Sequence, residues 1–254
     1  MKIALCLSGQ PRNYELGYQE LKKWFLDKYD IDVYLHAWKY TSNIETGHNF
    51  TASKTYSFTE QDYQNLLELY KPKSWIFQYP IPFDDTDIRG VPLNYKLSNI
   101  LSAAYSIRTC FNLLNNFDTK YDLVIRTRFD LQFTDYISPE CIFLKDLSLL
   151  DPNKFNTFSY PLTVEGFTTR QSEVDDLFVV SSPKITDIYT NYFGHIIKYI
   201  WMDENYPIWL NEHISENPDK IVAESLLKYH LVSNNIDIEY IPSLTEHYTA
   251  HIIR

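Results

Sequence analysis

Hydrophobic and polar residues follow one another in blocks that predict strands and helices in turn. Residues 2–7 form a short apolar run typical of a buried strand, and a polar turn follows at residues 8–12. Apolar residues near helical spacing then predict a helix over residues 14–28, and residues 31–38 predict a second strand. This strand–helix–strand order predicts a βαβ unit with parallel strands and a right-handed crossover.

The same kind of pattern continues through the rest of the chain. Residues 39–57 are polar and aperiodic, which indicates a surface excursion. Thr59 and Asp62 have the spacing of a capping box and predict a helix up to residue 70. The further predicted elements are a strand at 74–78, a loop at 80–92, a helix at 93–116, strands at 123–125, 157–163 and 177–181, helices at 184–201 and 219–234, and a strand at 236–241. We expect one α/β domain with a parallel first half and a mixed second half.

Composition narrows the class of protein. A chain of 254 residues that is 44% hydrophobic can bury the core of a full domain. A net charge of -10 argues against a nucleic-acid binder, because a phosphate backbone requires a basic face, yet it allows a small basic pocket. The aromatic content of 16% suits a carbohydrate-handling protein, whose aromatic faces stack on sugar rings, and equally suits an ordinary tyrosine-rich core.

The cysteines and the apolar runs bear on the compartment. Cys6, Cys110 and Cys141 are few, odd in number and not in metal-ligand spacing, which predicts a reducing compartment without a disulfide framework. The first apolar run is too short for a signal peptide, and no run approaches the ~20 residues that a membrane span requires. We therefore expect a soluble cytoplasmic protein.

The segment from Tyr121 to Phe133 carries the strongest chemical signal. Its apolar part predicts a buried strand, and Arg126, Arg128 and Asp130 follow at the strand's end. Charges at such a place are costly unless they are paired or used. They indicate either a structural ion pair that closes the sheet or a site for a phosphorylated ligand, with or without a bound metal ion.

Two other strand ends carry candidate residues, because ligands of open α/β sheets bind beyond the carboxyl ends of the strands. After the first strand, Ser8 and Gly9 permit close backbone approach, and Arg12 can reach over a bound anion. A plain turn is the alternative. His36 ends the second strand, either as a pocket residue or as a core histidine with satisfied hydrogen bonds.

Acidic and histidine residues in the second half suggest acid–base or metal chemistry. Glu173, Asp175 and Asp176 crowd together before an apolar strand, which raises at least one pKa and favours a general base; a solvated acidic loop is the alternative. His247 and His251 are four residues apart, which on a helix would present both to one metal ion, although the tail has no clear helical pattern.

Several catalytic motifs are missing from the sequence. There is no glycine-rich dinucleotide fingerprint, no P-loop, no Gly-x-Ser-x-Gly elbow, no His-Glu-x-x-His and no Cys-x-x-Cys. These absences argue against P-loop enzymes, serine hydrolases, zinc proteases and thioredoxin-like proteins.

Four blocks, at residues 3–12, 32–38, 121–130 and 175–181, together resemble a family of small glycosyltransferase-like proteins from large DNA viruses, phages and bacterial surface-polysaccharide clusters. The resemblance runs over most of the chain and is more specific for the family than for the reaction. It implies a GT-A, Rossmann-like fold with a mixed, mainly parallel central sheet flanked by helices. It also implies a nucleotide-sugar donor, a glycan acceptor, and one domain with a donor-binding half (1–135) and an acceptor-binding half (136–254).

The resemblance also assigns residues. Ser8, Gly9 and Arg12 would lie against the nucleotide, and Asp130 would occupy the place of the acidic metal-binding motif after the fourth strand. The usual Asp-x-Asp pattern is Arg128-Phe129-Asp130 in this chain, which puts metal dependence in question.

Two ways of neutralising the leaving diphosphate follow. In the first, Asp130 with His247 or His251 holds Mn²⁺ or Mg²⁺. In the second, Arg126 and Arg128 supply the positive charge directly. We favour the metal version, with the arginines in support.

The remaining roles concern the acceptor and the competing functions. Asp176, or its neighbour Asp175, is the candidate base that deprotonates the acceptor hydroxyl, with inversion at the sugar carbon. The alternative function is a catalytically inactive relative that binds glycans or nucleotides. A nucleotidyltransferase is a third possibility, but the glycine-rich or lysine-rich phosphate loop that would favour it is missing.

Overall fold

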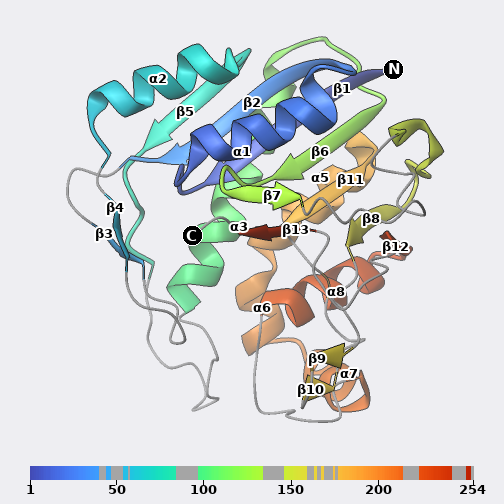
Figure 1. The fold of residues 1–254 in the computed structure, drawn as a ribbon. Helices are drawn as coiled ribbons and strands as arrows, with labels where there is room; N and C mark the ends of the chain where they lie inside the picture. The colour runs from blue at the N-terminus through green and yellow to red at the C-terminus, as the bar shows by residue number, and fades with distance from the viewer. Residues whose placement is uncertain are drawn as a thin grey trace.

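The chain forms an α/β structure around one central sheet, as seen in a computed structural model (Figure 1). The structure describes residues 1–39, 44–46, 54–56, 58–83, 97–133, 146–158, 163–164, 167–168, 174, 177–213, 223–241 and 250–252.

The central sheet has seven strands in the order β12-β8-β11-β6-β1-β2-β5. Its strands are β1 (Lys2–Gly9), β2 (Asp30–Trp38), β5 (Ser74–Gln78), β6 (Leu123–Thr127), β8 (Phe155–Phe158), β11 (Phe178–Ser181) and β12 (Ile238–Ile241). Strand β11 runs antiparallel to both neighbours, and the other neighbouring strands pair in parallel. The predicted mixed, mainly parallel sheet and its opening βαβ unit are therefore confirmed.

Helices cover both faces of this sheet (Figure 1). They are α1 (Tyr14–Leu21), the π-helical turn η1 (Lys22–Leu26), α2 (Glu60–Tyr70), α3 (Leu97–Asn112), α5 (Pro183–Asn191), α6 (Ile196–Trp201), α7 (Asn205–His213) and α8 (Ala223–Ser233), with 3-10 turns η2 (Leu113–Asn116), η3 (Leu147–Leu149) and η4 (Tyr192–Gly194). Short strands pair outside the main sheet: β3 (Ile44–Thr46) with β4 (Lys54–Tyr56), β9 (Thr163–Val164) with β10 (Phe167–Thr168), and β7 (Leu131–Phe133) with β13 (Ala250–Ile252).

Side-chain alternation along the strands divides the core into two layers. On β1, Leu5 and Leu7 belong to the apolar cluster that includes residues of α1 and α2. Ala4 and Cys6 point to the other face and pack with residues of α3. Helices α1 and α2 therefore cover one face of the parallel half, and α3 covers the other.

Most helix predictions hold, with two exceptions. The capping box is confirmed, because the Asp62 backbone N–H donates to Thr59 Oγ1 at 3.3 Å and the Thr59 N–H donates to Asp62 Oδ2 at 2.7 Å. The helix expected over residues 184–201 is interrupted at η4, which ends in Gly194, a residue that weakens helices. Helix α7 was not predicted, since its apolar residues lack a clear helical period.

Two further expectations concern thiols and membranes. Cys6 and Cys110 are buried free thiols, while Cys141 lies outside the described residues. Over the described ranges, no helix is long and apolar enough to cross a lipid bilayer.

Asp32 anchors the amino-terminal edge of the sheet. Its carboxylate accepts hydrogen bonds from Lys73 Nζ at 2.8 Å, from the Tyr121 hydroxyl at 2.7 Å and from Lys2 Nζ at 3.0 Å. Burial by itself raises the pKa of the Asp32 carboxyl, but these three donors outweigh burial and lower the pKa to about 2.

This depressed pKa predicts a pH-dependent contribution to stability. The contribution is complete above the unfolded-state pKa of about 3.9 and is lost as the pH falls towards 2. Asp32→Asn should therefore lower the free energy of unfolding at pH 6, and its difference from the wild type should shrink at pH 3 in urea titrations. Asp30→Asn, at a carboxylate that is 73% exposed, serves as the control and should change little at either pH. If Asp32→Asn lowers the free energy of unfolding by the same amount at both pH values, the lowered pKa of Asp32 does not contribute to stability.

Gly17 allows α1 to lie directly on the chain that follows β6. A Cβ atom at Gly17 would be 1.8 Å from the Phe129 carbonyl oxygen and 2.8 Å from its carbonyl carbon. No side chain fits there without moving the backbone. Gly17 therefore fixes the distance between α1 and the turn at Phe129-Asp130.

We expect Gly17→Ala to destabilise the fold by about 2–3 kcal/mol, because the added methyl group forces α1 away from this turn. Gly194→Ala is the matched control, since a Cβ there meets no atom within 4 Å, and its effect should stay within about 0.5 kcal/mol. Urea unfolding of both variants measures the difference. Equal stability of the two variants would show that the close approach at Gly17 is not required.

Candidate functional site

The candidate residues gather where the strand order of the sheet reverses. Strand β1 has β2 on one side and β6 on the other. The connection after β1 runs through α1 on one face, whereas the connection into β6 runs through α3 on the opposite face. Such a reversal opens a crevice at the carboxyl ends of the two strands, where ligands of open α/β sheets bind.

Two further strands lead to the same edge. Antiparallel β11 begins with Phe178 opposite Thr127 at the end of β6. Strand β13 pairs with β7 so that His251 lies opposite Gln132, which follows Asp130 by two residues. The structure does not describe the predicted base candidates Glu173, Asp175 and Asp176, nor His247. Of His251 it describes the backbone but not the side chain.

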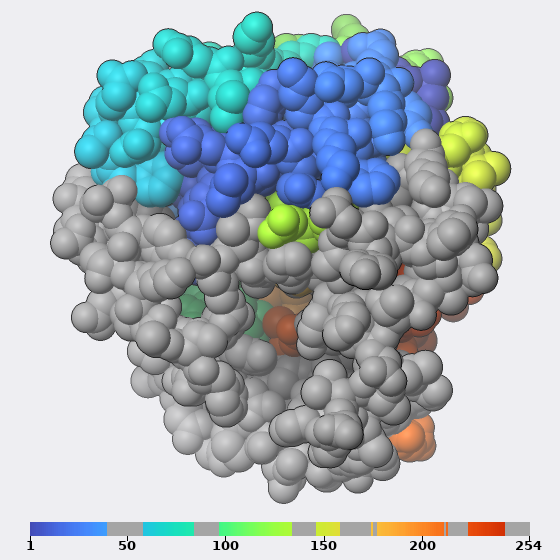
Figure 2. Space-filling model, in the orientation of Figure 1, coloured from blue at the N-terminus to red at the C-terminus, as the bar shows by residue number. Residues whose placement is uncertain are grey.

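The space-filling view of Figure 2 shows the bright green atoms of β7 directly below the blue atoms of the N-terminal segment. Strand β7 also contacts α1, so the chain that follows β6 lies against the helix that follows β1.

A buried carboxylate bound by two arginines forms the centre of the site. Asp130 is 0% exposed, and both of its oxygens accept hydrogen bonds. Arg128 donates from Nε to Oδ1 at 2.8 Å and from Nη2 to Oδ2 at 3.0 Å, a forked geometry. Arg12 donates to Oδ2 from Nη2 at 2.8 Å and from Nε at 3.1 Å. We call these three residues the arginine clamp.

The clamp is electrostatically positive. Burial by itself raises the pKa of the Asp130 carboxyl, but the charges and hydrogen bonds of Arg128 and Arg12 lower it below its ordinary value. Asp130 is therefore ionised at neutral pH, and the formal charges of the three clamp residues sum to +1. Both arginine side chains reach solvent in part, at 16% for Arg12 and 27% for Arg128.

Local packing explains why the clamp forms. Gly9 ends β1 with φ of 112°, a conformation that favours glycine, and Asn13 turns the chain into α1 with φ of 48°. Arg12 lies in this short connection. On the other side, Phe129 is fully buried against the edge of Tyr70, with ring centroids 6.2 Å apart, which fixes the turn that bears Asp130.

The clamp does not fit a metal ion. A divalent cation needs carboxylate oxygens that face it, and here both Asp130 oxygens face guanidinium groups that repel a cation. Among the described residues, no group of three His, Cys, Asp or Glu side chains could hold a metal ion. The metal role predicted for Asp130 with His247 or His251 would require the ion pairs to open.

The predicted residues Arg126 and Ser8 lie on the α3 side of the sheet. Arg126 is 5% exposed and pairs in register with Cys6, away from the Asp130 carboxylate. Arg12 is the second arginine on Asp130, a contact between distant segments that the sequence did not indicate. Ser8 is 2% exposed, and its Oγ has no hydrogen-bond partner among the residues that the structure describes.

His36 lies beside Ser8, as the register of β1 and β2 pairs them directly. Its Nε2 is 3.3 Å from Gln78 Oε1, which only accepts, so Nε2 carries the proton and Nδ1 accepts from the Ser106 hydroxyl at 2.7 Å. Burial lowers the pKa of His36 to about 4. His36 is therefore neutral, and both of its ring nitrogens have hydrogen-bond partners. This agrees with the interpretation of His36 as a core histidine, although the residue lies at the edge of the site.

Some residues of the site were missed in the sequence. Thr127 is fully buried at the end of β6, and its Oγ1 has no partner within the described part of the chain. Thr127 lies between Arg126 and Arg128 in the sequence, and its place at the end of an apolar strand could have indicated it. Gly17 gave no signal, because a lone glycine in a helix pattern does not reveal what lies across from it.

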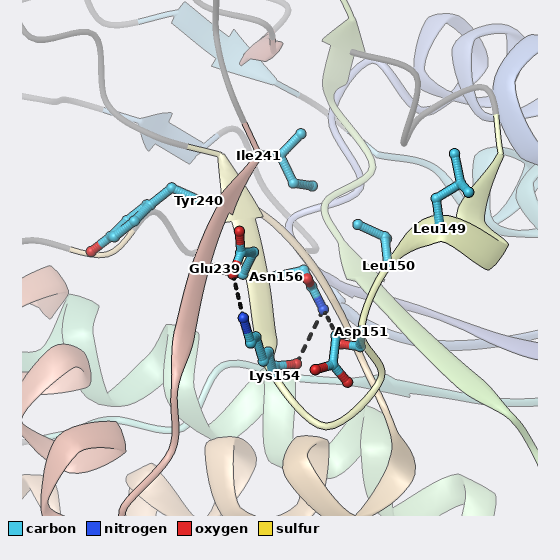
Figure 3. Close-up of a pocket in the computed structure, with 8 residues that line it drawn as sticks. All are labelled: Leu149, Leu150, Asp151, Lys154, Asn156, Glu239, Tyr240 and Ile241. Carbon is cyan, nitrogen blue, oxygen red and sulfur yellow. Dashed lines mark hydrogen bonds and ion pairs between the residues drawn. The ribbon is translucent and has the colours of Figure 1, made fainter. Parts of the chain in front are cut away.

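A hollow away from this site is lined by residues of β8, of β12 and of the segment before β8 (Figure 3). Its volume is about 230 Å³, and a Lys154–Glu239 ion pair of 2.7 Å lies along it. Strand β8 runs parallel to β6, so its amino-terminal end, which lines the hollow, points away from the clamp. None of the candidate residues lines it.

Comparison with models of known protein families and with curated proteins finds no match to this chain.

The clamp predicts a large stability effect at Asp130. Asp130→Asn keeps the shape but removes the charge, which leaves two largely buried arginines without their anion and should lower the free energy of unfolding by about 3 kcal/mol. Asp187 is 51% exposed and pairs with Arg108. Asp187→Asn breaks this pair and should lower the free energy of unfolding by less than about 1 kcal/mol. Chemical unfolding of both variants tests this; similar small losses would show that Asp130 does not anchor the arginines.

Proposed function

We propose that this protein is a glycosyltransferase that moves a sugar from a nucleotide-sugar donor to a glycan acceptor. The observation that carries the proposal is the position of three arginines at the carboxyl ends of β1 and β6, with Arg12 and Arg128 on Asp130 and Arg126 on the opposite face of the sheet. With Asp130, the formal charges of these four residues sum to +2, in a chain whose net charge is -10. A local positive site in an acidic protein suits an anionic small molecule such as a nucleoside diphosphate sugar.

The strand topology supports the finer proposal of a GT-A-like fold. Strands β1, β2, β5 and β6 are the first four strands of the main sheet in chain order, and Asp130 comes three residues after the fourth. The acidic motif of the GT-A enzymes that the chain resembles occupies this place. Strand β11, which runs antiparallel to both of its neighbours in the main sheet, starts beside the end of β6 and follows Asp176 by two residues in the sequence.

In the proposed reaction, a hydroxyl of the acceptor attacks the sugar carbon, and the bond from that carbon to the diphosphate breaks. The negative charge that grows on the leaving diphosphate is stabilised by guanidinium donors held in advance at the strand ends. Gly9 lets the backbone approach the ligand closely at the end of β1. Asp176 or Asp175 is proposed to take the proton of the attacking hydroxyl.

The second candidate is a relative that binds nucleotides or glycans without transfer. The observation that favours it is the engagement of both Asp130 oxygens by arginines, which leaves this carboxylate unsuited to metal-assisted catalysis. Binding and transfer measured on the same protein separate the two functions.

A thermal-shift screen tests the donor site directly. UDP-, GDP-, dTDP- and ADP-sugars at millimolar concentration should raise the melting temperature for at least one donor, because a ligand that binds only the folded state stabilises it. Arg128→Gln should remove the shift. Arg108→Gln is the matched control, since Arg108 also pairs with an aspartate and is similarly exposed, at 25% against 27%.

Release of free nucleoside diphosphate with a glycan acceptor then distinguishes an enzyme from a binder. Stabilisation with acceptor-dependent release supports transfer, and stabilisation without release under any acceptor supports the binding function. If no nucleotide sugar or free nucleotide shifts the melting temperature, the donor-site assignment fails.

A further inference from the structure

We propose that the hollow beside β8 and β12 is a separate binding site for one uncharged sugar unit (Figure 3). The inference goes beyond the proposed function, because the amino-terminal end of β8, which lines the hollow, points away from the arginine clamp. It requires that the protein binds a sugar at this place, and it does not require sugar transfer.

The first step of the argument is a buried amide that lines the hollow. Asn156 is 0% exposed. Its Nδ2 atom donates to the backbone oxygens of Asp151 at 2.8 Å and Lys154 at 3.1 Å, which Figure 3 marks with dashed lines, and to that of Val180 at 2.9 Å. A flipped amide would turn an acceptor towards these carbonyl groups, so the three bonds establish which amide atom is the oxygen.

The oxygen of this amide indicates a missing hydrogen-bond donor. Among the residues that the structure describes, none donates to Asn156 Oδ1. A buried carbonyl oxygen without a donor costs free energy, and a ligand or an ordered water commonly satisfies such an atom. The hollow lies next to this amide, so a ligand that binds there is expected to carry O–H or N–H groups.

The charged groups around the hollow disfavour a simple ion. Asp151 and Glu239 contribute carboxylates, which repel an anion, and Lys154 contributes an ammonium group, which repels a cation. Sugar hydroxyl groups meet neither repulsion. Each hydroxyl both donates and accepts, so a sugar can donate to the carboxylates and to Asn156 Oδ1 and accept from Lys154 Nζ.

The Lys154–Glu239 ion pair lies beside the buried amide and opens at little cost. In the parallel pairing of β8 and β12, Glu239 is the register partner of Asn156, so both side chains lie on the same face of the sheet. The ion pair of 2.7 Å joins side chains that are 35% and 51% exposed. Such an exposed pair contributes little to stability. Sugar hydroxyl groups can therefore replace it and reach the amide.

Apolar side chains and the size of the hollow fit a single sugar ring. Leu149, Leu150 and Ile241 line the same hollow, and the first is 50% exposed. In Figure 3 the two leucines lie on one side of Asn156 and Glu239 on the other, so an apolar and a polar wall are present. The C–H groups of a sugar ring suit the apolar wall. The volume of about 230 Å³ lies below the roughly 300–1,000 Å³ of sites for drug-sized ligands.

NMR titration of the isotope-labelled protein with methyl glycosides of glucose, galactose, mannose and N-acetylglucosamine tests the site. At millimolar concentration, at least one glycoside should shift the side-chain amide signals of Asn156 in a saturable way, because its Nδ2 belongs to the amide that receives the ligand's hydrogen bond. Inorganic phosphate, methylammonium and glycine are the anionic, cationic and zwitterionic probes, and they should leave these signals unchanged.

Glu239→Ala should weaken the binding of that glycoside about tenfold, since a hydrogen bond to a charged group is lost. Glu60→Ala is the matched control and should bind like the wild type. Glu60 also pairs with a lysine, Lys39, at 2.8 Å, and it is similarly exposed, at 66% against 51%. Circular dichroism checks the fold of each variant, and Lys154→Ala against Lys39→Ala gives the same test if Glu239→Ala does not fold.

Three outcomes overturn the inference. If no glycoside shifts the Asn156 signals, the hollow is not a sugar site. Equal affinities of Glu239→Ala and Glu60→Ala would place the binding elsewhere on the protein. Shifts caused by phosphate, methylammonium or glycine would assign the hollow to a charged ligand. None of these outcomes changes the proposed function, which depends on the nucleotide-sugar screen at other residues.

Discussion

The buried carboxylate of Asp130 determines the geometry of the site. A fully buried charge is tolerated only when it is paired and hydrogen-bonded, and Asp130 meets this condition with Arg128 from its own turn and Arg12 from the connection after β1. The two arginines are costly to hold near each other without an anion between them. One carboxylate therefore makes it possible to concentrate positive charge at a single edge of an acidic protein.

Packing around this pair constrains the neighbouring elements. Gly17 brings α1 into contact with the backbone of Phe129, and Tyr70 of α2 covers the Phe129 ring. The clamp is therefore tied to both helices on one face of the sheet, while Arg126 and Ser8 face α3 on the other. A ligand in the crevice between β1 and β6 would be flanked by fixed groups from both faces, which is the arrangement expected of a preorganised anion site.

The sequence predicted correctly which strand ends would lie at one edge of the sheet, because that signal was local. Ser8, Gly9, Arg12 and the segment from Arg126 to Asp130 were chosen because they follow apolar strands, and the strand ends do meet at one edge. The sequence did not predict which arginines contact Asp130, because side-chain alternation places Arg126 on the α3 face and the turn after β6 brings Arg128 back to Asp130. Sequence neighbours at a strand end need not share a face of the sheet.

The sequence by itself determined the elements, since apolar periodicity, the Thr59 capping box and the charged strand ends are properties of short segments. It also indicated that charged residues would lie at the carboxyl ends of β1 and β6, on one edge of the sheet. Only the tertiary structure decided which charges meet: Arg12 and Asp130 are 118 residues apart, and their ion pair depends on the β1–β6 pairing and on the close approach that Gly17 permits. A contact between distant segments arises from the packing of whole elements, which no local pattern encodes, and it turns a suspected metal ligand into the anchor of two arginines.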